Sequence, residues 1–175
     1  MLRILFCVLL LVTIVLGEVQ ASSDRSRYFI GITPSVTAEP FYNKGEFDVN
    51  VLPLVYQQTL FNKTDFRLTS IVNYSVRDTE NQLSHIGFEA AFPMRVFRRE
   101  RLLHQKDGFY FAPIMSIAHE QIKKENHIGF WLEPGYQFLF KHNYSMSIGL
   151  QAGVTLIADE VQNHFGINFI FGRWF

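Results

Sequence analysis

Apolar and polar residues alternate along much of the chain, and the alternation is clearest near its C-terminal end. From Tyr144 to Leu156 every even position is apolar, whereas the odd positions are small or polar. After a polar break at 158–163, apolar residues take most of the odd positions from Phe165 to Phe175. Successive side chains on a strand point to opposite faces, so each run has one apolar face and one small or polar face. The pattern predicts the closing hairpin of a β-barrel whose apolar face points outward.

Six further runs show the same alternation, and none has the period of a helix over three turns. Each run has roughly the nine to eleven residues, or slightly more, that a tilted membrane strand requires. The six runs cover residues 28–36, 47–56, 66–76, 83–97, 109–119 and 127–140. Together with the two C-terminal runs, they predict an all-β, eight-stranded antiparallel up-and-down transmembrane β-barrel that occupies residues 22–175.

Two features disturb this pattern. The residues expected to share one face of the second run are Phe47, Val49, Val51 and Val55. Leu52 and Leu54 fall between them and blur the alternation. Prolines also fall inside the runs, at positions 34, 53, 93, 113 and 134. Because proline cannot donate a hydrogen bond to a strand ladder, we expect bulges or strand ends near these positions.

The first 21 residues have the pattern of a secretory signal peptide. Arg3 gives the positive start, residues 4–16 form an apolar core, and Val19-Gln20-Ala21 is a small-residue cleavage site. The apolar core is shorter than the about 18 residues that a membrane-spanning helix needs. We therefore expect an exported chain that enters a membrane only as strands, and the cell outer membrane as its location.

The composition agrees with this interpretation. Sixteen basic and sixteen acidic residues give a formal net charge of zero, so the charge gives no reason to expect a nucleic acid partner. Eighteen phenylalanines are unusual for a soluble domain and fit a lipid-facing aromatic surface. The single cysteine, Cys7, lies in the expected leader, so we expect no disulfide, thiol catalysis or cysteine metal site in the mature chain.

The leader, the eight runs and the closing segment 166–175 resemble the small eight-stranded outer-membrane barrels of Gram-negative bacteria. This group includes OmpX-like proteins and the OmpA transmembrane domain. The resemblance implies that Phe169, Phe171 and Phe175 belong to a signal for the barrel-assembly machinery. It also implies a monomer in contact with outer-membrane lipid and lipopolysaccharide. Arg173 departs from the group's usual apolar or Tyr residue and is expected to snorkel at the interface.

Charged and amide residues collect on the face opposite the apolar one. They are Arg67, His85, Glu89, Arg95, Glu133, Gln137, Gln151 and Asn168. The interior of an eight-stranded barrel is just wide enough for side chains to fill, and buried charges must be paired and hydrogen-bonded. We expect a packed polar interior without an open pore. The alternatives are a narrow conduction path or proton relay, and an acid–base pair of Glu89 and Glu133, which lacks any nucleophile motif.

The candidates for catalysis or metal binding are few. Ser116, His119 and Glu120 are the weak candidates for a catalytic site. Ser116 and His119 are an odd number of positions apart, so a regular strand places them on opposite faces. His119, His127 and His164 are expected close to the outer rim. They could form a metal site there, but histidines where strands meet loops are more often solvated surface residues, and we interpret them so. We therefore expect no catalytic site, no metal and no cofactor.

The leading functional hypothesis is a non-enzymatic outer-membrane barrel with a structural or surface-interaction role in the envelope. Since the group that the chain resembles includes lipid A-modifying enzymes, a lipid A acyl hydrolase or transferase is the second hypothesis. A third is a soluble lipocalin-like barrel, with its apolar faces inside around a ligand. The third hypothesis differs from the other two in which side chains face inward. It requires Phe130, Leu150 and Phe169 inside, with Glu133 and Gln151 on the outside, whereas the first two require the reverse.

Overall fold

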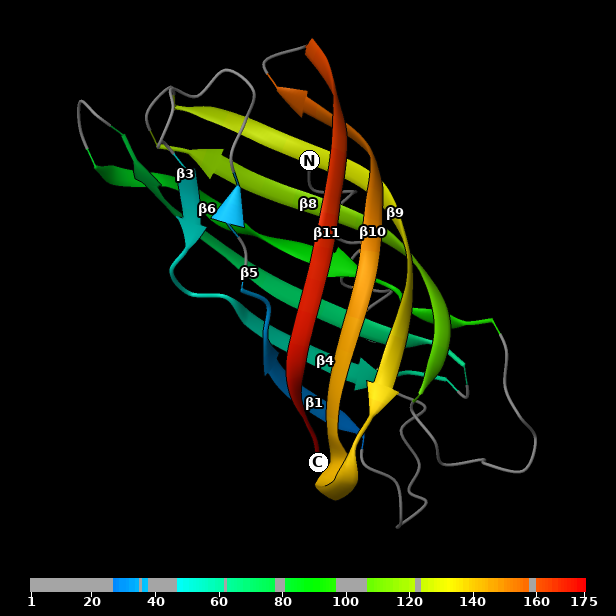
Figure 1. Ribbon diagram of the computed structural model, residues 1–175. Helices are drawn as coiled ribbons and strands as arrows, with labels where there is room; N and C mark the ends of the chain where they lie inside the picture. The colour runs from blue at the N-terminus through cyan, green and yellow to red at the C-terminus, as the bar shows by residue number, and fades with distance from the viewer. Residues whose placement is uncertain are drawn as a thin grey trace, which may run out of the picture.

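The computed structural model is an all-β barrel in which all neighbouring strands are antiparallel (Figure 1). It describes residues 27–34, 36–37, 47–61, 63–77, 81–96, 107–121, 124–157 and 160–175. The sheet closes on itself with eight strands around the barrel, so the predicted fold class is confirmed. The expected signal peptide, residues 1–21, lies outside the described residues.

Three of the eight barrel strands are divided, which gives eleven β segments among the described residues. The segments are β1 (Tyr28–Ile32), β2 (Val36–Thr37), β3 (Phe47–Asn50), β4 (Leu54–Thr59), β5 (Asp65–Val76), β6 (Gln82–Ala91), β7 (Met94–Arg95), β8 (Gly108–Glu120), β9 (Glu125–Leu139), β10 (Tyr144–Ile157) and β11 (Glu160–Trp174). A short 3-10 turn, η1 (Lys141–Asn143), joins β9 to β10. Around the barrel the order is β1, β4, β5, β6, β8, β9, β10 and β11. In the part of the chain that the structure describes, no helix is both long and apolar enough to cross a membrane.

The barrel closes through the pairing of β1 with β11. Phe29 is the cross-strand partner of Trp174, and the pairing continues to Ile32 and Phe171. The Phe175 N–H donates to the Tyr28 carbonyl at 2.6 Å, which extends the ladder to the last residue of the chain. The first and last barrel strands therefore complete the cylinder near the Lys141 end, where four residues of β1 pair with the C-terminal part of β11.

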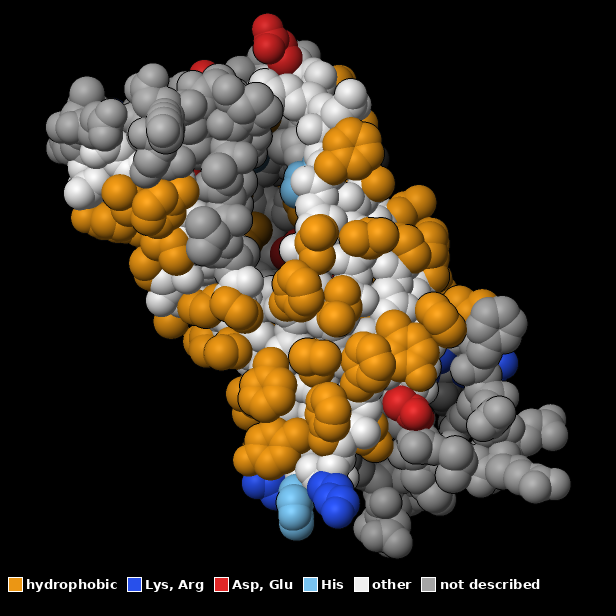
Figure 2. Space-filling model, viewed as in Figure 1, with side chains coloured by type: hydrophobic (Ala, Val, Ile, Leu, Met, Phe, Trp, Pro, Cys, Tyr) orange, Lys and Arg blue, Asp and Glu red, His pale blue; other side chains and the backbone are white. Residues whose placement is uncertain are grey.

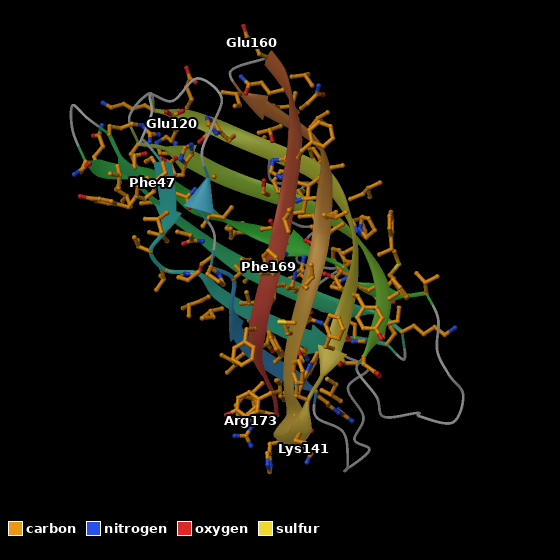
Figure 3. All side chains as sticks on the ribbon, in the orientation of Figure 1. Phe47, Glu120, Lys141, Glu160, Phe169 and Arg173 are labelled. Carbon is orange, nitrogen blue, oxygen red and sulfur yellow. The ribbon has the colours of Figure 1, made fainter. Side chains whose placement is uncertain are left out.

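The molecule has two ends that differ in charge. Lys141 and Arg173 lie at one end, whereas Glu120 and Glu160 lie at the other (Figure 3). We call these the Lys141 end and the Glu160 end. Figure 2 shows hydrophobic side chains gathered over the middle of the visible face, with basic side chains near the Lys141 end.

The prolines explain where the barrel strands are divided. The three prolines at divisions are Pro34, between β1 and β2, Pro53, between β3 and β4, and Pro93, between β6 and β7. Their carbonyls can still accept, and the Asp65 N–H donates to the Pro93 carbonyl at 3.0 Å. Pro113 and Pro134 lie inside β8 and β9. The expectation of bulges or strand ends is confirmed at Pro34, Pro53 and Pro93, and it is wrong at Pro113 and Pro134, which keep their places in the β8–β9 pairing without a register shift.

A bulge in the second barrel strand reverses its two faces. The register against β5 shifts by one residue between the pair Asn50–Asn73 and the pair Val55–Thr69. Phe47 is exposed on the outer surface, whereas Val55 is only 2% exposed and lies inside. The prediction that these two residues share a face is wrong, because one additional residue at 51–53 shifts the alternation by one.

The apolar face of the barrel points outward. Leu150 is 59% exposed, and Phe130 and Phe169 are each 46% exposed. Glu133, in contrast, has no exposed surface, and Gln151 is half-buried. This arrangement is the opposite of the one that a lipocalin-like barrel requires.

Aromatic side chains surround the exterior near the Lys141 end. Every barrel strand contributes one there: Tyr28, Tyr56, Phe66, Phe92, Phe109, Tyr136, Tyr144 and Phe171. Neighbouring rings are in contact in the pairs Tyr28–Tyr56, Phe66–Phe92, Phe109–Tyr136 and Tyr144–Phe171, with centroids 6.4, 5.6, 4.8 and 6.1 Å apart respectively. We call these eight residues the aromatic belt. The belt thus consists of four ring pairs, each of which joins two neighbouring barrel strands.

The bulge makes a testable contribution to stability. The Asn50 side chain accepts from the Leu52 N–H at 3.1 Å and from the Val72 N–H at 3.3 Å. It also donates to the Ser70 carbonyl at 2.9 Å. Asn50→Ala leaves these backbone groups unsatisfied, and we expect the free energy of unfolding to fall by about 1–3 kcal/mol.

Urea unfolding of the barrel refolded in detergent would measure this loss. The matched control is Asn163→Ala, which removes an exposed amide near the end of β11 and should change stability by less than about 0.5 kcal/mol. Equal effects of the two substitutions would show that Asn50 does not hold the bulge.

Candidate functional site

The interior of the barrel is organised around the carboxylate of Glu133 on β9. Its Oε1 accepts from Arg67 Nη2 at 3.0 Å and from the Tyr110 hydroxyl at 2.8 Å. Its Oε2 accepts from Gln151 Nε2 and from Asn168 Nδ2, each at 2.8 Å. The four donors come from β5, β8, β10 and β11, so five of the eight barrel strands meet at one buried carboxylate. We call these five residues the Glu133 cluster.

Arg67 carries the positive charge of this cluster. Its side chain is 1% exposed, so the guanidinium is almost completely shielded from water and is surrounded by protein atoms. Besides the 3.0 Å pair with Glu133, its Nη2 lies 3.8 Å from Glu89 Oε1. A buried charge is tolerated only when it is paired and hydrogen-bonded. Glu133 meets this requirement with four donors. Arg67 is hydrogen-bonded to Glu133 and lies within ion-pair distance of Glu89, whereas its buried Nε has no hydrogen-bond partner among the described residues.

Glycine on the neighbouring strand makes room for Glu133. Gly149 faces the interior from β10, and a Cβ at that position would lie 2.5 Å from Glu133 Cγ. Gly135 has a similar relation to Tyr110, whose Cζ would lie 2.4 Å from an added Cβ. Gly149 and Gly135 have no side chain, and the space beside their backbone is occupied by Glu133 and Tyr110.

Two further contacts extend the Glu133 cluster, one to Thr33 beside the first barrel strand and one to His164, which stacks on Trp131. The Thr33 hydroxyl, just after β1, donates to Asn168 Oδ1 at 2.8 Å. His164 Nε2 lies 3.4 Å from Gln151 Oε1. The His164 ring also stacks on Trp131, with centroids 4.1 Å apart and an interplanar angle of 18°. The polar contacts therefore continue from the cluster toward the Glu160 end.

A second charged group lies inside toward the Lys141 end. Asp65 at the start of β5 has no exposed surface. Arg95 donates to it through both terminal nitrogens, and Gln57 Nε2 donates to its Oδ2 at 2.7 Å. Gln137, also buried, contacts the Ser145 hydroxyl at 3.4 Å near the same end. An apolar cluster of Phe29, Val55, Ile170 and Trp174 accompanies these polar groups.

A third group forms around Asp48 near the Glu160 end. Asp48 Oδ1 accepts from the Ser75 hydroxyl at 2.6 Å and from Arg77 Nη2 at 2.7 Å. The Ser84 hydroxyl lies 3.5 Å from Asp48 Oδ2 and donates to the Asn73 carbonyl at 3.1 Å. Three segments, β3, β5 and β6, are joined by this group.

All eight residues assigned to the interior from the sequence lie on the inner face of the barrel. Arg67, Glu89, Glu133 and Gln137 are buried, and His85, Arg95, Gln151 and Asn168 are half-buried. The structure brings Arg67, Glu89, Glu133, Gln151 and Asn168 together, whereas Arg95 and Gln137 lie in the direction of the Lys141 end. His85 lies near the Glu160 end and contacts His127, with ring centroids 5.0 Å apart.

The weak catalytic candidates do not form a triad. Ser116 is buried on the inner face of β8, and His119 lies on the opposite face of the same strand, where its Nδ1 is 2.9 Å from Asn126 Oδ1. Glu120 points inward and pairs with His127 at 3.1 Å. Nucleophilic catalysis needs a nucleophile, a base and an orienting group within hydrogen-bond reach, and this arrangement separates them.

The closing aromatic residues lie on the exterior. Phe169, Phe171 and Phe175 are 46%, 49% and 57% exposed. Arg173 extends between aromatic rings there, with its Cζ 5.7 Å from the Tyr144 ring centroid and 5.3 Å from that of Phe175. The arrangement gives the guanidinium apolar and aromatic surroundings at the Lys141 end.

Sequence reasoning left several residues of the interior out of its list. Tyr110, Asp65, Asp48 and Gln57 were not among the predicted interior residues. For Tyr110 a signal existed, because it alternates in phase with Ser116 on β8. For Asp48 a signal existed too, because it lies between Phe47 and Val49, which were expected on the apolar face. For Gln57 the bulge at 51–53 obscured the inward direction, because this residue is in phase with Val55, which was expected to face outward.

No protein-family model, no curated protein and no solved structure matches the chain. The strand number, the antiparallel order and the closure between the first and last strands agree with a small barrel fold.

The pair Arg67–Glu133 has a measurable coupling energy. Glu133→Gln keeps the size and shape of the side chain but removes its charge, which leaves Glu89 as the only carboxylate paired with Arg67 in this cluster. We expect a loss of about 3 kcal/mol in the free energy of unfolding. Arg67→Met should cost a similar amount. The double variant should lose less than the sum of the two, because the two residues share one interaction.

Urea unfolding of the four proteins gives the double-mutant cycle. The control cycle pairs Glu133→Gln with Arg173→Met, which removes an exposed guanidinium on the exterior; these two should be additive. Additivity in the Arg67–Glu133 cycle would contradict the pairing.

Gly149 should be intolerant of a side chain because of the space that Glu133 occupies. Gly149→Ala places a Cβ 2.5 Å from Glu133 Cγ, and we expect a loss of about 1–3 kcal/mol. Gly166→Ala is the control, because its nearest contact would be the end of the Gln151 side chain at 3.2 Å. Gly166→Ala should change stability by less than about 0.5 kcal/mol, and an equal loss at both glycines would refute the argument.

Proposed function

We propose that this chain is an integral outer-membrane β-barrel protein with a structural or surface-interaction role in the cell envelope. The observation that carries the proposal is the division of the barrel into two chemically opposite faces. The exterior is apolar and bears the aromatic belt, whereas the interior holds the Glu133 cluster and the groups around Asp65 and Asp48. A soluble monomer rarely exposes a contiguous apolar surface larger than a few hundred Å².

The height of the apolar exterior supports a membrane location. On β10 the outward apolar positions run from Tyr144 to Leu156. At about 3.3 Å per residue and a tilt of about 40°, this run rises roughly 30 Å along the barrel axis. The apolar band of an outer-membrane barrel is about 25 Å high and is flanked by aromatic residues at the interfaces. The belt lies at the Lys141 end of such a band.

The end of the barrel at which the chain ends gives the proposed orientation. Connection length does not give it, because η1 at the Lys141 end has three residues and only residues 158–159 separate β10 from β11 at the Glu160 end. The closing segment, which the resemblance implies to be an assembly signal, ends at Phe175 at the Lys141 end, so in the proposed orientation this end faces the periplasm and the Glu160 end faces outward. Lipid and lipopolysaccharide are the proposed surroundings of the exterior.

The filled interior supports a structural role over transport. The Glu133 cluster draws side chains from five barrel strands into one set of contacts, and the two other charged groups join further strands. These contacts join side chains from neighbouring and facing strands inside the barrel. The proposed function is therefore that of a closed barrel, which presents its Glu160 end to the surroundings of the cell.

A charge placed on the middle of the exterior tests the membrane location. Leu150→Arg puts a guanidinium at the centre of the apolar band and should cost about 2–4 kcal/mol of folding stability in phospholipid vesicles. Val161→Arg, an equally outward position that is 64% exposed near the Glu160 end, should cost about 0–1 kcal/mol. In water both substitutions at exposed positions would be nearly neutral.

The quantity to measure is the fraction of each variant that is folded in vesicles. Folded and unfolded chains are distinguished by comparing the gel migration of heated and unheated samples. The same migration shift in the membrane fraction of cells is the expected result for the unmodified chain. Recovery of the chain in the soluble fraction without detergent, or equal effects of Leu150→Arg and Val161→Arg in vesicles, would refute the proposal.

A further inference from the structure

Three side chains that commonly bind metals converge inside the barrel near the Glu160 end. They are His85 on β6, Glu120 on β8 and His127 on β9, and one ligand atom of each lies within 4.8 Å of the other two. Glu120 Oε2 and His127 Nε2 are 3.1 Å apart. We propose that these three residues bind one divalent transition-metal ion of the zinc class inside the barrel at its Glu160 end.

The sheet itself brings the three residues together. His85 and Glu120 are direct cross-strand partners, and His127 is the partner of Ala118, two positions before Glu120. Direct and diagonal neighbours on one face of a sheet have Cβ atoms about 5–8 Å apart, within reach of long side chains. Three adjacent strands thus present one ligand each at the same level of the inner surface.

The separations are close to those of a metal site. Zinc binds imidazole nitrogen at about 2.0–2.1 Å and carboxylate oxygen at about 2.0–2.2 Å, which places tetrahedral ligands roughly 3.4 Å apart. Glu120 and His127 already have that spacing. The His85 ligand atom lies within 4.8 Å of the other two ligand atoms, so it must move by at most about 1.4 Å to reach the tetrahedral spacing. The two imidazole rings are already in contact.

The ligand types select the class of ion. Two imidazoles and one carboxylate suit zinc and its transition-metal neighbours, whereas Ca²⁺ and Mg²⁺ prefer sites built from oxygen ligands alone. Three protein ligands also leave a fourth position for water or another ligand. Glu125, the cross-strand partner of Glu120, adds a second carboxylate near the Glu160 end and favours a cation there.

The site is largely enclosed. The side chains of His127 and Glu120 are 16% and 9% exposed, and the atoms His127 Nε2 and His85 Nδ1 are buried. A register shift in the pairing of β5 with β6, next to Asn73 and Tyr74, places Ser84 and His85 at a bulge. Bulges commonly re-aim a side chain beside a functional site. The proposal does not depend on the membrane location, because it concerns the inner face alone.

Titration with the metal alone tests the proposal. The full chain, produced without a histidine tag, is refolded in detergent, treated with a chelator, freed of the chelator and titrated with Zn²⁺ by calorimetry. We expect saturable binding of one ion per chain. His85→Gln, Glu120→Gln and His127→Gln should each weaken binding by about 100-fold or more, since loss of even an outer partner of a ligand costs about 10- to 100-fold.

His119→Gln is the matched control. It removes an imidazole from the residue beside Glu120, but on the outer face of β8, and it should leave the affinity for Zn²⁺ unchanged. Gel migration of unheated samples checks that each variant is folded. X-ray absorption at the zinc edge on the unmodified chain gives a readout that needs no variant, with scattering from two imidazoles as the expected result.

The possible outcomes separate clearly. Binding of one ion with two imidazole ligands, lost in the three inner variants and kept in His119→Gln, supports the site. An absence of saturable binding overturns it. Binding that the three inner variants retain, or a zinc spectrum without imidazole scattering, also overturns it, because the ion would then lie elsewhere.

Discussion

The structure depends on the enclosure of a carboxylate that no solvent reaches. Glu133 has no exposed surface and accepts four hydrogen bonds from four other strands. A charge in such a place is stable only if its partners hold their positions. The narrow interior of an eight-stranded barrel supplies that rigidity, and Gly149 supplies the space. The same requirement explains why small residues and long polar ones share the inner face.

The interior changes in character along the barrel axis. Toward the Lys141 end, Trp174 and its apolar neighbours pack beside the Asp65 group. The Glu133 cluster fills the middle, and the Glu160 end holds Asp48 with its serines and the His85–Glu120–His127 group. Buried charges thus occur at all three levels of the interior, with Asp65, Glu133 and Asp48 each joining neighbouring strands.

Much of the fold follows from alternation in the sequence, but the composition of the site does not. A period of two assigns each residue to a face, which was enough for the strand number and for residues such as Glu133. Alternation does not tell which residues of different strands face each other, because that depends on register. His127 was grouped with His119 and His164 as a rim histidine, whereas the register places it beside Glu120. Val55 was misplaced because a bulge changes the phase without a distinct sequence pattern.

The two faces of the barrel are consequences of a single alternating pattern, so neither can change alone. A slip of one residue would turn every apolar side chain of a strand inward and every polar one outward. At 51–53 the chain makes such a shift, and the pattern changes with it: Asp48 and Asn50 face inward before the bulge, and Val55 and Gln57 face inward after it. The sequence on each side is matched to the register that it adopts. The apolar exterior therefore constrains both halves of this strand, whereas the interior accepts polar residues such as Asp48 and Gln57 and also an apolar residue, Val55, that packs in a buried apolar cluster.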